Sequence, residues 1–205
     1  MARVAVLGGS FNPIHYGHLL LADDVLEQLA LDRVLFVPAG SPPHKPAGLL
    51  APAPHRYEMV RRAITDHPRF EVSDIELRRP GYSFTVDTLR ALAAGGDELF
   101  YIVGSETFLD LLTWREPRTV AALARLVVIP RAGSVFNTEG AAAQKVLHEI
   151  GVEGGFVHDE HATSLPLSAS DLRRRVREGR SLAYRVPPAV IAYVREHGLY
   201  RAEPA

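Results

Sequence analysis

Apolar and polar positions alternate in blocks along this chain. Short apolar runs rich in Val, Ile, Leu and Phe are typical of buried strands, and they occupy residues 4–7, 34–37, 70–73, 99–103, 126–129 and 156–158. Most are separated by stretches with helical spacing; in residues 19–29, the apolar positions 21, 25, 26 and 29 fit one helical face. This alternation predicts an α/β fold, a parallel sheet with helices on both faces and ligands beyond the carboxyl ends of the strands.

Length and composition add limits to this picture. With 205 residues and 47% apolar side chains, we expect a single domain over residues 1–205, with a C-terminal helical part from about residue 168. The absence of cysteine excludes disulfides, thiolate nucleophiles and cysteine-based zinc sites. No signal peptide and no apolar run of membrane-spanning length are visible, so we expect a cytoplasmic protein without a membrane partner.

Charge narrows the classes of partner. The net charge of −1 disfavours a general nucleic-acid binder. Nearly all cations are arginine, since Lys45 and Lys145 are the only lysines, and a lysine at a given position is therefore the more informative residue. The oligomeric state is left open, and a homo-oligomer agrees with the sequence as well as a monomer does.

The first predicted strand leads directly into an unusual turn, Gly8-Gly9-Ser10-Phe11-Asn12-Pro13-Ile14-His15-Tyr16-Gly17-His18. Glycines here allow backbone N–H groups to approach an anion, and the following helix N-terminus adds partial positive charge. His15 and His18 stand at i and i+3, so on a first helical turn they share a face and can donate to one polyphosphate. A metal pair is the alternative, although no third ligand is evident nearby. The spacing matches neither GxxxxGK[ST] nor GxGxxG.

This turn resembles the GGTFDPxHxGH signature of the nucleotidyltransferase superfamily, and residues 15–18 match its HxGH element in full. In that superfamily HxGH binds the phosphates of ATP and stabilises the transition state of adenylyl transfer. The resemblance implies a Rossmann-like nucleotidyltransferase fold. It also implies that the turn contacts ATP through Gly8, Gly9, Ser10, Phe11, His15 and His18.

Three later segments resemble nicotinate mononucleotide adenylyltransferases. Residues 41–45 resemble the PPHK loop of that family, in which Lys45 would be a point charge for phosphate. Residues 55–59 resemble the start of the family's next helix, with helix capping and surface charge as the competing interpretation. Residues 81–89 resemble the SYTxDTL segment, and the family's threonine aligned with Thr85 contacts the pyridine nucleotide. A Ser or Thr at a helix start is otherwise a cap.

Two further resemblances are incomplete. Residues 102–106 resemble an IIGxD strand end followed by a tryptophan, a region that holds the nicotinate ring and ribose. Trp114 is expected on the next helix, but Glu106 replaces the usual Asp and Arg115 stands where Tyr is common. Residues 168–173 resemble the ISSTxxR signature, with Ala and Ser in place of its second Ser and its Thr. There, serines at a helix start would direct backbone N–H groups at an anion, and Arg173 would bind phosphate bidentately.

These resemblances occur in family order over the whole chain. They imply a nicotinate-nucleotide adenylyltransferase, which converts ATP and nicotinate mononucleotide to deamido-NAD and pyrophosphate, a step of NAD synthesis. The implied catalytic residues are His15, His18, Lys45 and Arg173. ATP would also contact Gly8, Gly9, Ser10, Phe11, Gly104, Ser168 and Ser170. The pyridine nucleotide would contact Lys45, Ser83, Thr85, Glu106, Trp114, Arg115 and Arg131. Mg²⁺ would be bound mainly through the ATP phosphates, with no protein side chain as metal ligand.

Other functions remain as alternatives. An adenylyltransferase of the same superfamily could act on phosphopantetheine or nicotinamide mononucleotide, although phosphopantetheine enzymes usually carry TxGH. Class I aminoacyl-tRNA synthetases also use a HIGH-like turn, but this chain is too short for one. A nucleotide sensor would bind ATP without releasing pyrophosphate. An RNA-binding module using the arginines near residue 173 would lose affinity steeply with salt.

Overall fold

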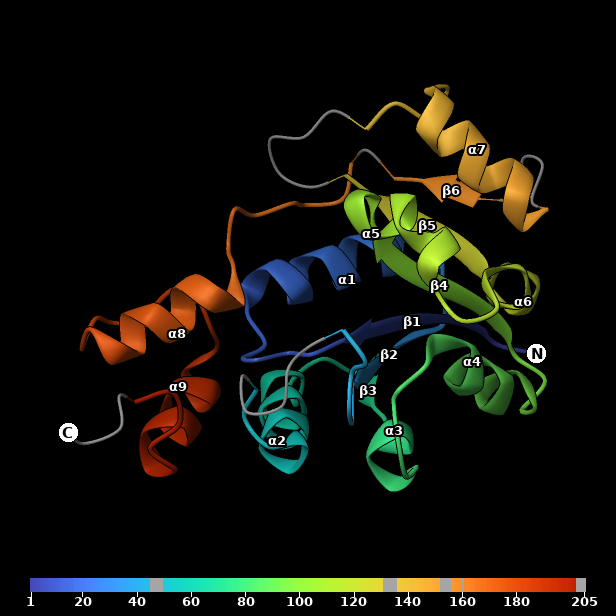
Figure 1. Cartoon of the computed structure of the whole chain (residues 1–205). Helices are drawn as coiled ribbons and strands as arrows, with labels where there is room; N and C mark the ends of the chain where they lie inside the picture. The colour runs from blue at the N-terminus through green and yellow to red at the C-terminus, as the bar shows by residue number, and fades with distance from the viewer. Residues whose placement is uncertain (45–49, 131–135, 152–155, 160, 202–205) are drawn as a thin grey trace.

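The computed structural model describes residues 1–44, 50–130, 136–151, 156–159 and 161–201. Its centre is a six-stranded sheet with strand order β3-β2-β1-β4-β5-β6, in which every neighbouring pair is parallel (Figure 1). The strands are β1 (Arg3–Gly9), β2 (Arg33–Pro38), β3 (Phe70–Val72), β4 (Glu98–Gly104), β5 (Arg125–Ile129) and β6 (Phe156–His158). All six lie where the apolar runs predict strands, and the α/β fold with a parallel sheet is confirmed.

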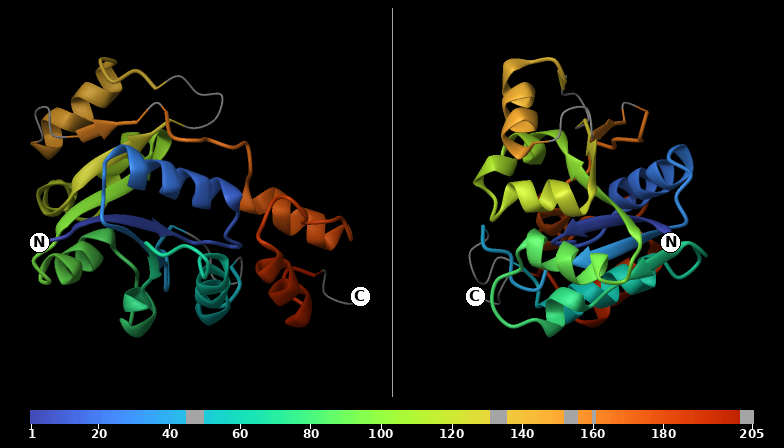
Figure 2. Two further views of the ribbon diagram at one scale, coloured as in Figure 1. Left: turned by 180° about the vertical axis from the view of Figure 1, so that it is seen from behind. Right: turned by 90° about the vertical axis from the view of Figure 1, so that its right-hand side faces the viewer.

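Helices connect the strands and cover the sheet. They are α1 (Tyr16–Gln28), α2 (Ala53–Ala63), α3 (Ile75–Arg78), α4 (Thr85–Ala93), α5 (Ser105–Leu109), α6 (Pro117–Leu123), α7 (Ala141–Ile150), α8 (Ala169–Arg177) and α9 (Pro188–Glu196), with one 3-10 turn, η1 (Leu111–Thr113). Figure 2 shows α8 and α9 together at one end of the molecule, away from α7 and β6. The first of these two helices, α8, begins at Ala169.

Two hydrophobic layers enclose the sheet, because successive side chains of a strand point to opposite faces. Ala5 and Leu7 of β1 pack in the layer that contains buried residues of α1, α2 and α9. Val4 and Val6 pack in the other layer, with buried residues of α4, α5, α6 and α7. The predicted helices on both faces are confirmed, and the unbroken apolar character of β1 follows from its burial on both sides.

The strand order places a crevice at the end of β1. The chain passes from β1 to β2 on one side, whereas β4 pairs with β1 on the other side. In such sheets ligands bind outside the carboxyl ends of the strands at the point where the order reverses. The opening glycines end β1 at this point.

Local details differ slightly from the sequence predictions. The buried face of α1 is formed by Ala22, Val25 and Leu26, so the small Ala22 belongs to it and was not predicted. Trp114 does not lie on a helix; it follows η1 with extended backbone, because the helix after β4 is only five residues long. Gly198 has a φ of 60° just after α9, one residue beyond the helix cap, where left-handed backbone favours glycine.

Candidate active site

Crowding explains the small residues of the opening turn. A Cβ atom at Gly8 would lie 3.1 Å from the Tyr101 hydroxyl, and one at Gly9 would lie 3.1 Å from the ring of Phe11. A Cβ at Gly17 would lie 3.0 Å from Nδ1 of His15. Side chains at these positions would displace the neighbouring rings. Glycine therefore lets the end of β1 and the start of α1 approach the rings that surround them.

His15 and His18 form one unit at the start of α1. His15 is the N-cap residue and is buried, and its ring stacks on that of His18 with 3.7 Å between centroids. The His15 backbone N–H donates to Nδ1 of His18 over 3.3 Å. Because Nδ1 of His18 accepts this bond, we assign its proton to Nε2 when the ring is neutral, and Nε2 is then the donor.

Burial keeps both rings uncharged at neutral pH. Loss of solvent lowers the pKa of His15 to about 4. Burial also lowers the pKa of His18 well below its usual value, and the nearby His15 lowers it further. Nδ1 of His15 is buried and has no hydrogen-bond partner within the part of the chain that the structure describes. An unsatisfied buried nitrogen is costly, as expected of a group that awaits a ligand.

Arg56 holds the loops around the turn, a role that the sequence analysis missed. It is buried on α2, and its guanidinium donates to the Ala51 carbonyl (2.8 Å) and the Ser10 carbonyl (2.8 Å). It also donates to the carbonyls of Ala39 and Gly40, after β2. The helix start predicted at residues 55–59 is confirmed. The available signal was spacing: Arg56 lies three and four residues before buried apolar positions and so shares their face.

Asn12 joins three more segments to the turn. Its carbonyl accepts from Nη1 of Arg173 (2.9 Å), and its side-chain Oδ1 accepts from the Tyr200 hydroxyl (2.8 Å) and the Ala51 N–H (3.0 Å). Arg173 also donates to the Ser170 hydroxyl over 3.2 Å. The predicted Arg173 and Ser170 are thus brought to the turn. Tyr200 was not predicted, since a tyrosine beyond the last helix carries no motif.

The other serine of the second signature acts as a helix cap. The hydroxyl of Ser168, the N-cap residue of α8, accepts a hydrogen bond from the Asp171 N–H over 3.1 Å. This satisfies one of the N–H groups left unpaired at a helix start. The bond stabilises the first turn of α8, and the contact of this helix with the opening turn is made by Arg173.

A hollow of about 390 Å³ opens beside the turn. We call it the acceptor hollow; it is lined by Gly8, Gly9, Ser10, Ala39, Pro42, Pro43, His44, Glu76, Ser83, Phe84, Thr85, Tyr101, Thr107, Thr113, Trp114 and Arg115. The structure therefore brings together the glycines of the turn and four residues predicted to contact the pyridine nucleotide, Ser83, Thr85, Trp114 and Arg115. The volume falls within the usual range of about 300–1,000 Å³ for small-molecule sites.

Tyr101 and Glu76 are lining residues that the sequence analysis missed. Burial raises the pKa of Tyr101 to about 12, so its hydroxyl is protonated, and it is hydrogen bonded with the side chain of Thr85. Its ring meets that of Trp114 edge to face, with 6.1 Å between centroids. Glu76 is buried, and its carboxylate accepts from the Thr88 hydroxyl over 2.7 Å. Glu76 lies outside the segments that resemble the family, and Tyr101 lies in an apolar strand, so the sequence gives no sign that either residue lines a site.

Arg115 and Ser83 both line the acceptor hollow. The Arg115 guanidinium lies 3.6 Å from the Asp87 carboxylate and 4.9 Å from the centre of the Phe84 ring. The Ser83 hydroxyl accepts from the Ser41 N–H over 3.0 Å. The start of α4 thus carries one wall, and the loop after β2 is tied to it.

Glu106 and Gly104 lie elsewhere. Both line a second hollow with Ser105, Ile129, Pro130 and other residues, and neither lines the acceptor hollow. The neighbouring Thr107 lines both. Successive residues of a helix point about 100° apart, and Thr107 but not Glu106 also reaches the acceptor hollow. Lys45 and Arg131, the remaining predicted residues, lie outside the described residues.

No group of three or more His, Cys, Asp or Glu side chains placed to hold a metal ion occurs among the described residues. Within the same part of the chain, no helix is long and apolar enough to cross a membrane.

The chain is similar to known proteins over nearly its whole length. The family model described as cytidylyltransferase-like matches residues 6–175. A protein of Thermus thermophilus named "Probable nicotinate-nucleotide adenylyltransferase" is 45% identical over 204 residues, covering 97% of this chain and 100% of that protein. One of the same name from Roseiflexus sp. is 44% identical, covering 98% of each chain.

The fold also matches solved structures. The nicotinic acid mononucleotide adenylyltransferase of Plasmodium falciparum, solved in complex with NaAD, superposes with a TM-score of 0.76 at 18% identity, covering 98% of each chain. At that identity the likeness shows the fold alone. The identities of the sequence relatives and the family model carry the assignment further: the chain belongs to the cytidylyltransferase-like family and, within it, to the nicotinate-nucleotide adenylyltransferases.

Proposed function

We propose that the turn at residues 8–18 binds the phosphates of ATP, that the acceptor hollow binds nicotinate mononucleotide, and that an adenylyl group passes between them. One observation carries this proposal: Gly8, Gly9 and Ser10 belong to the turn and also line the acceptor hollow. Two anionic substrates would therefore meet at one strand end. Holding both reactants in place supplies much of the rate enhancement in reactions of this kind.

The reaction needs little acid–base chemistry from the protein. A phosphate oxygen of the mononucleotide, already ionised at neutral pH, attacks the α-phosphorus of ATP and forms a new P–O bond. The bond from the α-phosphorus to the bridging oxygen breaks, and pyrophosphate leaves with that electron pair. Negative charge grows on the leaving group and on the α-phosphate. The protein must stabilise this charge with fixed donors.

Neutral donors at the start of α1 suit this task. His18 offers an Nε2–H group at a helix N-terminus, and the stacked His15 brings a second imidazole. Both pKa values are lowered, so both rings are already neutral at neutral pH before ATP binds. The negative charge of ATP would raise both pKa values. Arg173 supplies a full positive charge at the same turn. Lys45 is proposed, from the resemblance alone, to add a second.

Mg²⁺ would be held mainly by the phosphates of ATP. The described residues contain no group of three possible metal-ligating side chains. Magnesium usually keeps several waters and binds through substrate phosphates in such sites. When bound, it would neutralise phosphate charge during transfer.

We assign selection of the pyridine nucleotide to the wall of the acceptor hollow that carries Thr85, Trp114 and Arg115. Trp114 offers an aromatic face, and Thr85 lies beside it through Tyr101. A nicotinate carboxylate needs hydrogen-bond donors, and Arg115 adds positive charge at this wall. We therefore propose a preference for nicotinate over nicotinamide mononucleotide.

The test is a side-by-side assay of pyrophosphate release. ATP, Mg²⁺ and the protein are combined with nicotinate mononucleotide, nicotinamide mononucleotide or phosphopantetheine. We expect the highest kcat/KM with nicotinate mononucleotide and formation of deamido-NAD. ATP binding without pyrophosphate release would indicate a nucleotide sensor, and turnover only with another acceptor would overturn the assignment of the hollow.

A further inference from the structure

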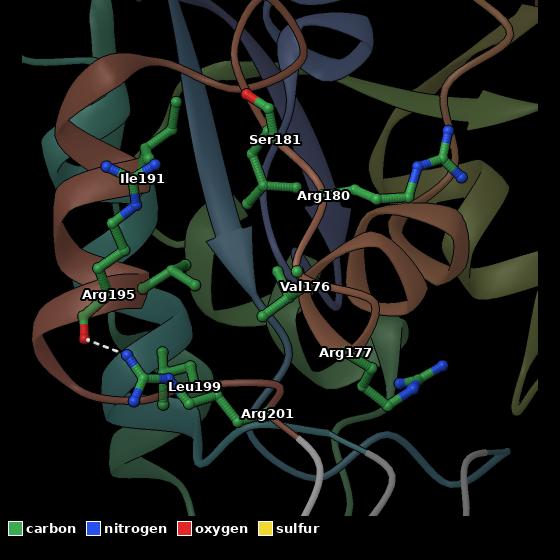
Figure 3. A pocket seen from close by; sticks show the side chains of 11 residues that line it. Val176, Arg177, Arg180, Ser181, Ile191, Arg195, Leu199 and Arg201 are labelled. Atoms are coloured by element: carbon green, nitrogen blue, oxygen red, sulfur yellow. Dashed lines mark hydrogen bonds between the residues drawn. The ribbon is translucent and has the colours of Figure 1, made fainter.

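A separate hollow of about 440 Å³ lies between α8 and α9 (Figure 3). We call it the α8–α9 hollow. Its lining consists of Val176, Arg177, Gly179, Arg180, Ser181, Leu182, Ile191, Val194, Arg195, Leu199 and Arg201. None of these residues has a role in the proposed reaction. The size is that of a small-molecule site.

The lining combines aliphatic side chains with arginines. Five lining residues are Val, Leu or Ile, four are arginine, and none is acidic. All four arginines are exposed. Between described residues, Arg180 has an ion pair with Glu178 at 3.3 Å, and Arg201 donates to the Arg195 carbonyl at 3.5 Å. No ion pair within the described part of the chain involves Arg177 or Arg195, so their charges are available to a ligand.

Like charges also crowd around this hollow. Arg175, on the same helix, has its pKa lowered by burial and by the positive charges of Arg185 and Arg180, while Asp171 and Glu178 act in the opposite direction. An anion bound at Arg180, which lines the hollow, would reduce the repulsion between Arg180 and Arg175. Guanidinium groups match phosphate and carboxylate oxygens in pairs, so the charge of this lining favours those two head groups.

The apolar part of the lining restricts the class of ligand further. It has no aromatic ring on which a base could stack, whereas its aliphatic side chains suit an alkyl body. We propose that the α8–α9 hollow binds a small amphiphilic anion, with a phosphate or carboxylate head on the arginines and an aliphatic body over Val176, Leu182 and Ile191.

Both walls of this hollow connect to the opening turn. Helix α8 carries Arg173, whose side chain donates to the Asn12 carbonyl. The segment after Leu182 reaches Arg185, whose carbonyl accepts from the Tyr16 N–H over 3.0 Å at the start of α1. A ligand that braces these two elements therefore also braces the residues beside His15, and the hollow is a regulatory site for the turn.

Calorimetric titration tests the binding. Octyl phosphate, used below its micelle-forming concentration, is compared with inorganic phosphate and with octyl glucoside, which keep only the charge or only the alkyl chain. We expect octyl phosphate to bind at least about tenfold more tightly than either, because it uses both parts of the lining. Equal binding of inorganic phosphate or of octyl glucoside would overturn the proposal.

Matched variants locate the site. In Arg177→Ala/Arg195→Ala we expect the Kd for octyl phosphate to rise by about tenfold or more, since two charged donors are lost. Arg174→Ala removes an exposed arginine of the same helix that does not line the hollow, and its Kd should equal that of the parent. An unchanged Kd in the double variant would overturn the site. So would a second copy of the chain covering this face, seen as a dimer that excludes octyl phosphate.

Amide hydrogen exchange tests the connection without relying on catalysis. Octyl phosphate should slow exchange of the Tyr16 N–H, which bonds to the Arg185 carbonyl. The double variant should show no such slowing at the same concentration. Octyl phosphate that binds with no change at Tyr16 would overturn the regulatory role. Because these measurements need neither substrate, they fail or succeed independently of the proposed adenylyl transfer.

Discussion

The opening turn and the acceptor hollow meet at one strand end, yet they are built differently. In the turn, Phe11, Asn12 and His15 are buried, and side chains from α2, α8 and the C-terminal segment bond to it. In the hollow, Trp114 is only partly buried and Arg115 is exposed. Donors for a growing charge must be fixed before reaction, whereas a wall that admits and releases substrates can remain open.

The difference also appears in the reach of each network. Asn12 accepts hydrogen bonds from Ala51, Arg173 and Tyr200, which lie 39, 161 and 188 positions further along the chain. The wall of the acceptor hollow that carries Thr85, Trp114 and Arg115, which we call the acceptor wall, is held over shorter stretches of chain: Arg115 pairs with Asp87, 115 − 87 = 28 positions away. The turn should therefore depend on the whole fold, and the wall should tolerate change. The following predictions test this contrast.

Loss of Arg56 should have the largest effect. Arg56→Ala leaves four partly buried carbonyls without their donor and opens a cavity in the face of α2. Each unsatisfied buried group costs about 1–3 kcal/mol, so we expect the free energy of unfolding to fall by about 3–5 kcal/mol. Urea denaturation followed by circular dichroism measures this change.

A neighbouring arginine provides the control. Arg61 lies on the same helix but is exposed, and it pairs with Glu58. Arg61→Ala should leave the free energy of unfolding close to that of the parent. Equal losses in the two variants would show that the carbonyls around the turn do not depend on Arg56.

Removal of His18 should damage catalysis far more than stability. Loss of one fixed donor to a growing charge lowers kcat by about 10²–10³, whereas the single hydrogen bond from His15 N–H is worth about 1 kcal/mol. Steady-state rates of pyrophosphate release and urea denaturation of His18→Ala separate the two effects. His197→Ala, at an exposed histidine beyond α9, should keep the parent kcat. A folded His18→Ala protein with full kcat would remove the histidine from the mechanism.

Acid should destabilise the turn through His15. Its folded pKa is about 4 against 6.5 for an ordinary histidine. Between these values the unfolded chain binds a proton that the folded chain does not, so stability is complete above pH 6.5 and falls as the pH drops towards 4. A shift of this size corresponds to at most about 3 kcal/mol. Stability measured from pH 7 to 4 should fall less in His15→Gln, and parallel curves would contradict the buried neutral ring.

The sequence revealed the turn because its chemistry is contiguous. The first strand, the glycines and both histidines lie within about fifteen successive residues, and backbone geometry alone places them together. The residues that hold the turn could not be found in this way. Arg56 and Tyr200 reach it only through tertiary packing, and an arginine at a helix start or a tyrosine after the last helix has many ordinary roles.

The acceptor wall shows a second limit of sequence interpretation. Resemblance placed Glu106 with Trp114, but the structure places it with Gly104 in another hollow. Adjacent positions on a short helix can serve different cavities, and no periodicity reveals which one faces the substrate. Tyr101 was assigned to the core as part of an apolar strand, although its hydroxyl reaches the hollow beside Thr85.

The smallest effect is expected at Arg115. Its guanidinium is exposed, so its ion pair with Asp87 contributes little to stability, and Arg115→Ala should unfold at the parent's urea concentration. If its charge attracts the nicotinate carboxylate, KM for nicotinate mononucleotide should rise about threefold to tenfold while kcat and the KM for ATP stay constant, because uniform binding is lost. With nicotinamide mononucleotide, which lacks the carboxylate, KM should not change. A fall in kcat as large as that of His18→Ala would mean that the wall is as tightly coupled to the chemistry as the turn, and the contrast between the two regions would then fail.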